Sequence, residues 1–493
     1  MSNIIIYTSC GILFLYLLFL LREELHIMQQ NSYYNARYIK WLRSNFFFRL
    51  AVVRTLFKQK EKIKLNFTPR ATRLFVCEIV LIVILVCIPI LLNADLWLII
   101  LVLAICAFFS FAVILFANIC MIPMEKIIAQ WYINDAKKKL KKHDGLIKIA
   151  ITGSYGKTSV KHFLYSILSE KYSVLMTPGS FNTTLGVVRT IREQLQPINE
   201  VFIAEMGAKR LGDIQEICDI VNPNFSILTS VGHQHLETFG SFENVKKTKL
   251  EIITTLSADG VGYVNFDNLN YSDIPQATKA KIISFAVHSP ADYTAKNVQY
   301  KNTGMSFDVF CHNEKILTLE TRLLGEHNVS NLLACCSLAL DLCVENYKIE
   351  NAVRRIKPVE HRLEVKQQSN GITIIDDAFN SNPVGAKMAL KVLKQFEGKK
   401  KIIITPGMIE LGQKEYELNF EFGQMIATHC DIAVLVGIKQ TKPIQDGIKS
   451  TDFPVENLFV CRNLNEANEQ VKKIMQVGDV VLYENDLPDT FNE

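Results

Sequence analysis

Three long stretches in the first quarter of the chain carry almost no charged side chains. Residues 1–21 have none, Phe75–Leu92 contains only Glu78, and Leu96–Met124 has none. A helix needs about 20 apolar residues to cross a hydrocarbon layer roughly 30 Å thick. The pattern therefore predicts about three transmembrane helices within residues 1–125, and these stretches help to explain a hydrophobic content of 49%.

The pattern changes beyond residue 145. Apolar runs rich in Val and Ile there alternate with stretches of helical periodicity, which is typical of parallel sheets with crossover helices. Because the alternation restarts after Pro358, we expect a central α/β domain at 145–357 and a smaller, C-terminal Rossmann-like domain at 358–493. The candidate strands are Ile147–Thr152, Val201–Glu205, Phe225–Ser230, Val261–Asn265, Lys281–Phe285, Ile372–Asp376, Lys401–Thr405, Ile432–Val436, Asn457–Val460 and Val480–Tyr483.

The loop between the first two apolar stretches, residues 22–73, is strongly basic. It holds twelve Lys and Arg against three Glu, with aromatic residues between them. Basic loops remain on the cytoplasmic side, so we expect a multi-pass protein of the cell membrane whose domains after residue 125 face the cytoplasm. Two interpretations of the loop stay open. In the first it sets the orientation of the protein and lies on anionic membrane lipid; in the second it binds an anionic lipid-linked substrate.

Net charge and cysteine usage exclude two other classes. The formal net charge is only +5, and the basic excess lies beside the predicted helices, so a nucleic-acid partner is not expected. The 12 cysteines contain no CxxC pair. They are interpreted as small buried residues in a reducing compartment and not as a disulfide framework.

The strongest chemical signal is a glycine-rich turn that follows the first predicted strand of the central domain and precedes a helical stretch. Its sequence is Gly153-Ser154-Tyr155-Gly156-Lys157-Thr158-Ser159. In such a turn, backbone N–H groups close on phosphate oxygens, the lysine reaches the β and γ phosphates, and the threonine hydroxyl can ligate Mg²⁺. The spacing is two residues shorter than the general phosphate loop. The strand–turn–helix context nevertheless favours ATP binding over a purely structural turn.

Six ordered segments resemble motifs of the Mur ligase family, over roughly residues 147–485. The glycine-rich turn is similar to that family's TGxxGKT[TS] loop. The other five segments are Thr177–Gly186, Val231–Ser241, Gly325–Asn331, Arg362–Glu364 and Ile375–Pro383. The resemblance implies a P-loop central domain and an ATP-dependent ligase that forms an amide bond through an acyl phosphate.

The resemblance also implies a magnesium site with Thr158, Glu205 and His235 as ligands, whose oxygen and imidazole groups suit the ion. Lys249 aligns with a lysine that the family carbamylates, which would turn a cation into an anionic oxygen ligand. Lys157, Lys249 and His235 are therefore the expected catalytic residues. Considered alone, each residue also has a purely structural interpretation. Glu205 would be a partner in a salt bridge, His235 a packed side chain, and Lys249 part of a solvated helix face.

The residues expected around the nucleotide follow from the same resemblance. Family members hold the adenine near the positions of Asn328 and Asn331, while Arg362 and Asp377 bind phosphate and ribose from the other side of the domain boundary. Because such a site is divided between two domains, we expect the domains to close before chemistry.

The resemblance is nearest to members that add D-alanyl-D-alanine to a muramoyl peptide in peptidoglycan precursor synthesis. This sequence departs from the pattern of those members in two places, and both correspond to the sites where they bind their substrates. The apolar N-terminal region stands in place of a soluble UDP-binding domain, and Leu482–Asp489 replaces a K-G-S-type segment near the incoming dipeptide. One alternative is therefore the same mechanism with another cell-envelope, lipid-linked or poly-amino-acid acceptor. The other is a membrane P-loop protein that is not a ligase.

Overall fold

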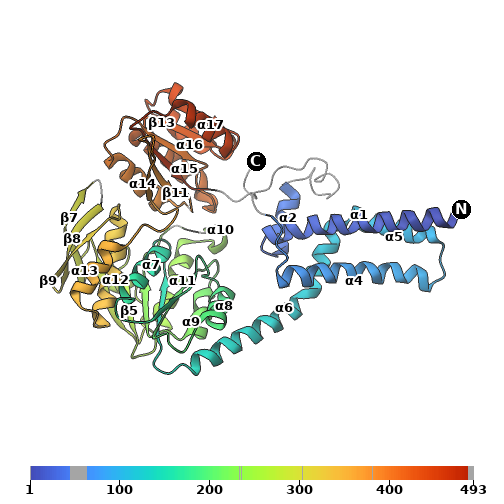
Figure 1. Ribbon diagram of the computed structural model, residues 1–493, viewed down its shortest axis with the longest axis horizontal. Coiled ribbons are helices and arrows are strands. Elements are labelled where there is room, and N and C mark those ends of the chain that lie inside the picture. Colours follow the sequence, from blue (N-terminus) through green and yellow to red (C-terminus); the bar gives the residue numbers. More distant parts are fainter. Residues whose placement is uncertain are drawn as a thin grey trace. The chain divides into compact units, whose positions relative to one another are not determined.

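The computed structural model describes residues 2–44, 64–232, 234, 236–301, 304–379 and 381–486. The chain divides into two compact units, of which the first ends at Trp131 and the second begins at Tyr132. Helices dominate the first unit, and two β-sheets with their covering helices form the second (Figure 1). The middle of the basic loop predicted at 22–73 lies outside the described residues, which omit 45–63.

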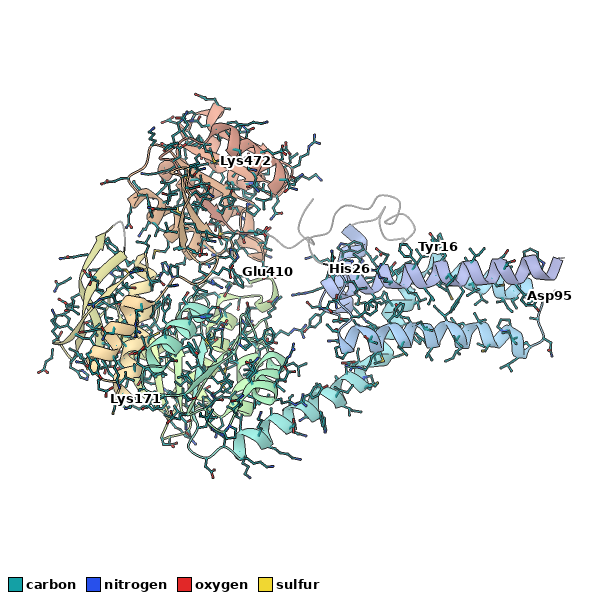
Figure 2. The ribbon with its side chains drawn as sticks, in the orientation of Figure 1. Tyr16, His26, Asp95, Lys171, Glu410 and Lys472 are labelled. Atoms are coloured by element: carbon teal, nitrogen blue, oxygen red, sulfur yellow. The ribbon has the colours of Figure 1, made fainter. Side chains whose placement is uncertain are left out.

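The first unit is a bundle of long apolar helices. Asp95 lies in the turn between two of them, at one end of the bundle (Figure 2). The helices are α1 (Ser2–Gln30), α2 (Asn35–Ser44), α4 (Pro69–Leu91), α5 (Leu96–Phe108) and α6 (Ser110–Lys141). Within the described residues, α4 and α6 are long and apolar enough to cross a membrane, whereas α5 has only 13 residues. The predicted number of three membrane-spanning helices is therefore not confirmed.

The third predicted span is not one straight helix. Leu96–Met124 is divided at Phe109, where α5 ends and α6 begins. A buried polar contact accompanies the break: the Ser110 hydroxyl donates a hydrogen bond of 3.0 Å to Glu24, which also accepts one from Tyr38. The apolar run does not show this break by its composition, because the polar partner Glu24 belongs to a different helix, α1.

The larger sheet of the second unit has nine strands in the order β2-β3-β1-β4-β5-β6-β7-β8-β9. Neighbouring strands are parallel from β2 to β7, and β7, β8 and β9 are antiparallel. The strands are β1 (Ile147–Thr152), β2 (Val174–Met176), β3 (Val201–Glu205), β4 (Phe225–Leu228), β5 (Val261–Asn265), β6 (Lys281–Ala286), β7 (Tyr293–Lys301), β8 (Gly304–Cys311) and β9 (Glu314–Thr321). The predicted α/β class with parallel sheets is confirmed.

Helices cover both faces of this sheet, because each parallel connection must cross over it. One apolar core joins the sheet to the helices α7 (Lys157–Leu168), α12 (Glu326–Asp341) and α13 (Asn346–Arg355). The opposite core joins it to α8 (Thr184–Gln194), α9 (Asp213–Val221), α11 (Phe242–Thr254) and the last turns of α6. The short helix α10 (Leu236–Phe239) precedes α11.

The smaller sheet has six strands in the order β10-β11-β15-β12-β13-β14, and only β10 runs antiparallel to its neighbour. The strands are β10 (Glu364–Gln367), β11 (Thr373–Asp377), β12 (Lys401–Thr405), β13 (Ile432–Val436), β14 (Leu458–Cys461) and β15 (Val480–Glu484). Helices α14 (Pro383–Gln395), α15 (Glu415–His429) and α16 (Lys442–Lys449) share one apolar core with it, and α17 (Leu464–Ile474) belongs to another. Both sheets thus carry loops at the carboxyl ends of parallel strands, where ligands bind in such folds.

Candidate active site

The glycine-rich turn lies between the end of β1 and the start of α7, where only glycine fits at two positions. Gly156 has φ +80°, and a Cβ there would lie 2.5 Å from the Asn331 Oδ1. A Cβ on Gly153 would lie 2.0 Å from the Thr229 Oγ1. The Lys157 ammonium donates hydrogen bonds to the carbonyl oxygens of Gly153 (2.7 Å) and Ser154 (3.1 Å). The turn therefore holds its lysine at the start of a helix, which is the geometry of a phosphate site.

The segment after β4 holds this turn in place, and the sequence analysis did not identify it. The Ser230 hydroxyl accepts a hydrogen bond of 2.8 Å from the Tyr155 N–H, and the Ser154 hydroxyl donates one of 3.1 Å to the Gly232 carbonyl. The Thr229 hydroxyl also donates to the Tyr155 carbonyl. Thr229 and Ser230 were predicted to lie within the strand Phe225–Ser230, but the strand ends at Leu228, and this frees both hydroxyls to support the turn.

Glu205, at the carboxyl end of β3, lies beside the turn. Its Oε1 accepts hydrogen bonds from Thr158 (3.2 Å) and Asn182 (3.0 Å), and its Oε2 lies 3.0 Å from the Lys161 Nζ. Burial raises the pKa of this carboxyl, but the charges of Lys161 and Lys157 outweigh that effect and lower the pKa below its usual value. Glu205 is therefore an anion, although its side chain is only 1% exposed. The roles of Lys161 and Asn182 were missed from the sequence.

Thr158 and Glu205 fit a magnesium ion by their donor chemistry. Both offer hard oxygen atoms, which Mg²⁺ prefers, and the Glu205 Oε2 has only the Lys161 ammonium, 3.0 Å away, as a charged partner among the described residues. His235, the third predicted ligand, lies outside the described residues. Among the residues described, no three His, Cys, Asp or Glu side chains gather into a metal site.

Lys249 lies in α11 and is 2% exposed. Burial lowers its pKa well below the usual value for lysine, and the nearby charge of Lys157 lowers it further. The pKa of Lys157 is itself lowered by burial, to about 8, although Glu205 opposes the shift. A buried amine with a low pKa spends more of its time neutral, which is the form that reacts with carbon dioxide and other electrophiles.

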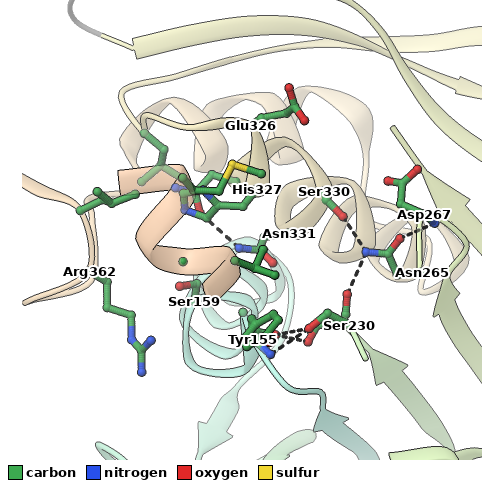
Figure 3. A pocket seen from close by; sticks show the side chains of 18 of the residues that line it. Tyr155, Ser159, Ser230, Asn265, Asp267, Glu326, His327, Ser330, Asn331 and Arg362 are labelled. Atoms are coloured by element: carbon green, nitrogen blue, oxygen red, sulfur yellow. Dashed lines mark hydrogen bonds between the residues drawn. The ribbon is translucent and has the colours of Figure 1, made fainter. Parts of the chain in front are cut away.

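A cavity of about 340 Å³ opens beside the turn (Figure 3). Asn328 and Asn331, both in α12, line it, and the Asn331 amide donates a hydrogen bond of 3.2 Å to the Asn328 Oδ1. Arg362 and Asp377 line it from the chain beyond α13. The cavity therefore brings together four predicted nucleotide-binding residues with Gly156 and Ser159 of the turn.

Two acidic or basic groups of this cavity have shifted pKa values. Burial raises the pKa of Asp377 to about 6, and the Arg362 charge opposes the shift. Burial lowers the pKa of His327 to about 4, so this imidazole is neutral near pH 7. The His327 Nδ1 has no hydrogen-bond partner among the described residues, which leaves a polar atom available to a ligand of this cavity. His327 was not among the predicted site residues.

The residues of this site lie within segments that match known protein families. The Mur ligase middle domain family matches residues 151–339, and the Mur ligase glutamate ligase domain family matches residues 361–483. The UDP-N-acetylmuramoyl-tripeptide–D-alanyl-D-alanine ligase of Haemophilus influenzae is 32% identical over 341 residues, which cover 67% of this chain and 73% of that protein. The chain belongs to the Mur ligase family. It is therefore an ATP-dependent ligase of the amide-forming type, and enzymes of this family use ATP and Mg²⁺.

One further Mur ligase sequence and two solved Mur ligase structures are also similar to this chain. The enzyme of the same name from Bacillus subtilis is 29% identical over 338 residues, covering 68% of this chain and 72% of that protein. The crystal structure of MurF from Acinetobacter baumannii superposes with a TM-score of 0.66 at 25% identity, over 74% of this chain and 78% of that one. MurF from Thermotoga maritima in complex with ADP superposes with a TM-score of 0.64 at 24% identity, over 73% and 80%, and supports the fold alone.

Proposed function

We propose that this Mur ligase joins D-alanyl-D-alanine to a UDP-N-acetylmuramoyl tripeptide. Two similar proteins carry the name of that reaction, and each is matched over more than two thirds of its length. The observation that carries the proposal is the contact between Thr158 and Glu205 at the start of α7, together with the cavity that the predicted nucleotide-binding residues line. This arrangement suits transfer of a phosphoryl group to a carboxylate.

The reaction proceeds in two steps. A carboxylate oxygen of the acceptor bonds to the γ-phosphorus of ATP, the bond to the β–γ bridging oxygen breaks, and ADP leaves. The amine nitrogen of the dipeptide then bonds to the carbonyl carbon of the acyl phosphate, loses a proton, and expels inorganic phosphate. Fixed positive groups stabilise the charge that develops on the oxygens in both steps.

Different residues of the chain have different roles in this reaction. Lys157, once released from the Gly153 and Ser154 carbonyls, binds the β and γ phosphates, and the backbone N–H groups of the turn hold the remaining oxygens. Thr158, Glu205 and His235 would hold Mg²⁺, which when bound neutralises phosphate charge. Lys249 would be carbamylated and supply a further anionic oxygen, and its low pKa supports that modification.

Nucleotide binding is divided between the two proposed catalytic domains. Asn328 and Asn331 of the domain at 145–357 hold the adenine, and Arg362 and Asp377 of the domain at 358–493 bind phosphate and ribose. Both pairs line one cavity, which supports this assignment. Movement of the second domain against the first would then exclude water from the acyl phosphate.

The helical region at 1–125 is proposed to anchor the enzyme in the cell membrane through about three spans, with the catalytic domains in the cytoplasm and the basic loop on anionic lipid. The lengths and compositions of α4 and α6 support this, as does the excess of Lys and Arg in residues 22–73. Such an anchor favours one second candidate, a lipid-linked acceptor for the same reaction. Retention of the protein in membranes washed with alkaline carbonate is expected, and release into the wash would contradict anchoring.

The deciding experiment is phosphate release by detergent-solubilised protein with ATP and Mg²⁺. UDP-N-acetylmuramoyl tripeptide and D-alanyl-D-alanine are supplied together and singly, and Lys157→Ala serves as the inactive control. Release that requires both substrates and Lys157 would support the proposal. Bound ATP without release, with tripeptide and dipeptide both present, would reject this substrate pair and direct the assay to lipid-linked acceptors.

A further inference from the structure

Two carboxyl groups are buried inside the apolar helix bundle of the first unit. Glu24 lies in α1 and Glu78 lies in α4, and neither side chain is exposed. The two carboxyls lie close enough for their charges to interact. Ionisable side chains among apolar helices are costly and often mark a functional site. These two groups therefore need an explanation that membrane anchoring alone does not supply.

Both carboxyls lie at the same level of the bundle, between two apolar clusters. On α4, Ile82 and Leu74 lie one helical turn to either side of the carboxyl, and they belong to different clusters. On α1, Leu20 belongs to the cluster of Ile82, and Met28 belongs to the cluster of Leu74. The carboxyl of α1 lies one turn from each of these two residues, so the clusters enclose both carboxyls from above and below.

Glu24 is fixed by hydroxyl groups from two other helices. Its Oε1 accepts a hydrogen bond of 3.0 Å from Ser110, the first residue of α6, and its Oε2 accepts one from Tyr38, in α2. A hydroxyl oxygen that donates its proton still has lone pairs for another partner. We call the four residues Glu24, Tyr38, Glu78 and Ser110 the polar layer of the bundle, and all four side chains are fully buried.

Glu78 differs from Glu24 in its surroundings. Neither of its oxygen atoms has a hydrogen-bond partner among the residues that the structure describes. Arg73, the basic residue closest to it along α4, donates hydrogen bonds of 2.7 and 2.9 Å to Glu125 of α6. A buried carboxyl without a partner is unfavourable in either protonation state. Its two oxygens are thus available to a ligand that carries positive charge.

We propose that Glu24 and Glu78 bind a divalent metal cation in the polar layer. The hydroxyl oxygens of Ser110 and Tyr38 complete a ligand set of two carboxylates and two hydroxyls. Oxygen atoms of this kind suit Ca²⁺ and Mg²⁺, and a doubly charged ion holds together two carboxylates that otherwise repel each other. Because the layer is fully buried, a larger cationic ligand would have to open the bundle. The ion joins four helices of the first unit, and this role is independent of the proposed ligase reaction.

The tryptophans of the chain allow this site to be measured separately from the catalytic domains. All three, Trp41, Trp97 and Trp131, lie in the first unit, so tryptophan fluorescence during thermal unfolding reports on the bundle. The full chain in detergent is treated with a chelator and then supplied with Ca²⁺, Mg²⁺ or Mn²⁺, without nucleotide. An ion at 100 times its dissociation constant shifts the unfolding equilibrium by about 100-fold. The Tm should therefore rise by about 5 °C or more.

Three variants locate the effect. Glu78→Gln should abolish the rise in Tm, because an amide gives the ion no negative charge. Glu125→Gln, the matched control, makes the same substitution at a carboxyl that already has Arg73 as its partner, and it should keep the rise. Ser110→Ala removes one hydroxyl ligand and should weaken cation binding severalfold. That variant tests the site even if Glu78→Gln does not fold.

A rise with at least one of the three ions in wild type and in Glu125→Gln, together with no rise in Glu78→Gln, would support the proposal. An equal rise in Glu78→Gln would place the bound ion elsewhere and overturn it. So would an unchanged Tm of the wild type with every ion. If acidification in the presence of chelator raises the Tm as much as the ions do, and the ions then add nothing, Glu78 holds a proton and the metal site is rejected.

Discussion

The carboxyl edges of the two sheets hold buried ionisable groups of opposite kinds. At the larger sheet, Lys157 and Lys249 have lowered pKa values and surround Glu205, which stays ionised. At the smaller sheet, burial raises the pKa of Asp377 to about 6 and that of Glu484 to about 7. The edge of the larger sheet therefore holds an ionised carboxyl beside lysines with lowered pKa values, whereas the edge of the smaller sheet holds carboxyl groups that ionise close to neutral pH.

The difference teaches that partners decide the charge of a buried carboxyl, and depth alone does not. Glu205 and Glu484 are both 1% exposed. Glu205 has the Lys161 ammonium 3.0 Å away, whereas the partners of Glu484 within the described part of the chain are two hydroxyls, those of Ser381 and Thr405. A hydroxyl supplies one hydrogen bond and no net charge, so it compensates less of the cost of desolvating an anion.

The largest expected effect is on Lys249. If its amine carries a carbamate that completes the metal site, Lys249→Ala should lower the rate of phosphate release by about 1000-fold or more, because that ligand stabilises several kcal/mol of transition-state charge. Lys247→Ala, an exposed lysine on the same helix, is the matched control. Wild-type rates in Lys249→Ala, together with an unmodified mass for the intact protein, would remove the carbamate from the mechanism.

Breaking the ion pair between Lys161 and Glu205, at the edge of the larger sheet, should have an effect of nearly the same free energy. Here the quantity that falls is the free energy of unfolding. Lys161→Met leaves Glu205 as a buried anion without its nearest cation, and such losses amount to about 3–5 kcal/mol of unfolding free energy. Adding Glu205→Gln should restore most of the loss, since the uncompensated charge is then gone. Urea unfolding of the single and double variants measures this. A single variant as stable as wild type would show that the pair contributes little.

At the smaller edge, Glu484→Gln should change the pH dependence of stability. The folded pKa of Glu484, about 7, lies above its ordinary value of 4.5, so the folded state binds the proton more tightly. The stability that Glu484 contributes to the folded state is fully present below pH 4.5 and is lost as the pH rises through 7. The variant should therefore gain stability over wild type toward pH 8, by up to about 3 kcal/mol.

Thermal unfolding between pH 5 and 8 measures this difference, and Glu364→Gln, on the edge strand β10, is the control. Parallel curves for wild type and Glu484→Gln would mean that Glu484 is ionised in the folded protein at neutral pH. The contrast between the two edges would then disappear.

The smallest expected effect is at Thr405, whose hydroxyl donates a hydrogen bond of 2.7 Å to Glu484. Thr405→Val keeps the side-chain volume and removes that donor, so a loss of about 1 kcal/mol is expected at pH 8. Less should be lost at pH 5, where the carboxyl is protonated. An equal loss at both pH values would assign the effect to packing.

The strands rich in Val and Ile were predictable because burial on both faces leaves a continuous apolar run. The bounds of β1, β3, β5, β12 and β13 agree with the sequence analysis. The antiparallel β7, β8 and β9 were missed, although β8 buries Met305, Phe307 and Val309 in alternation. A search for continuous apolar runs does not find a strand with one polar face.

Much of the site was predictable from the glycine-rich turn and the ordered motifs, since Thr158 does lie against Glu205 and the pairs Asn328–Asn331 and Arg362–Asp377 do line one cavity. Lys161 was not predictable, because a lysine on a helix is normally solvated and only the fold brings it to Glu205. The metal-ligand, catalytic and domain assignments stay predictions that the experiments above test.

Arg362 lines the cavity of the predicted nucleotide-binding residues and also a second cavity, of about 690 Å³, whose walls include Thr158 and His162. This shared wall has a thermodynamic consequence. If a nucleotide in the first cavity moves that guanidinium and changes the affinity of the second cavity for its ligand by some factor, the second ligand must change nucleotide affinity by the same factor. A coupling free energy of 1–3 kcal/mol, typical of linked sites, corresponds to about 5- to 150-fold. Each ligand would then change the affinity for the other through a side chain that both cavities share, with no separate regulatory element.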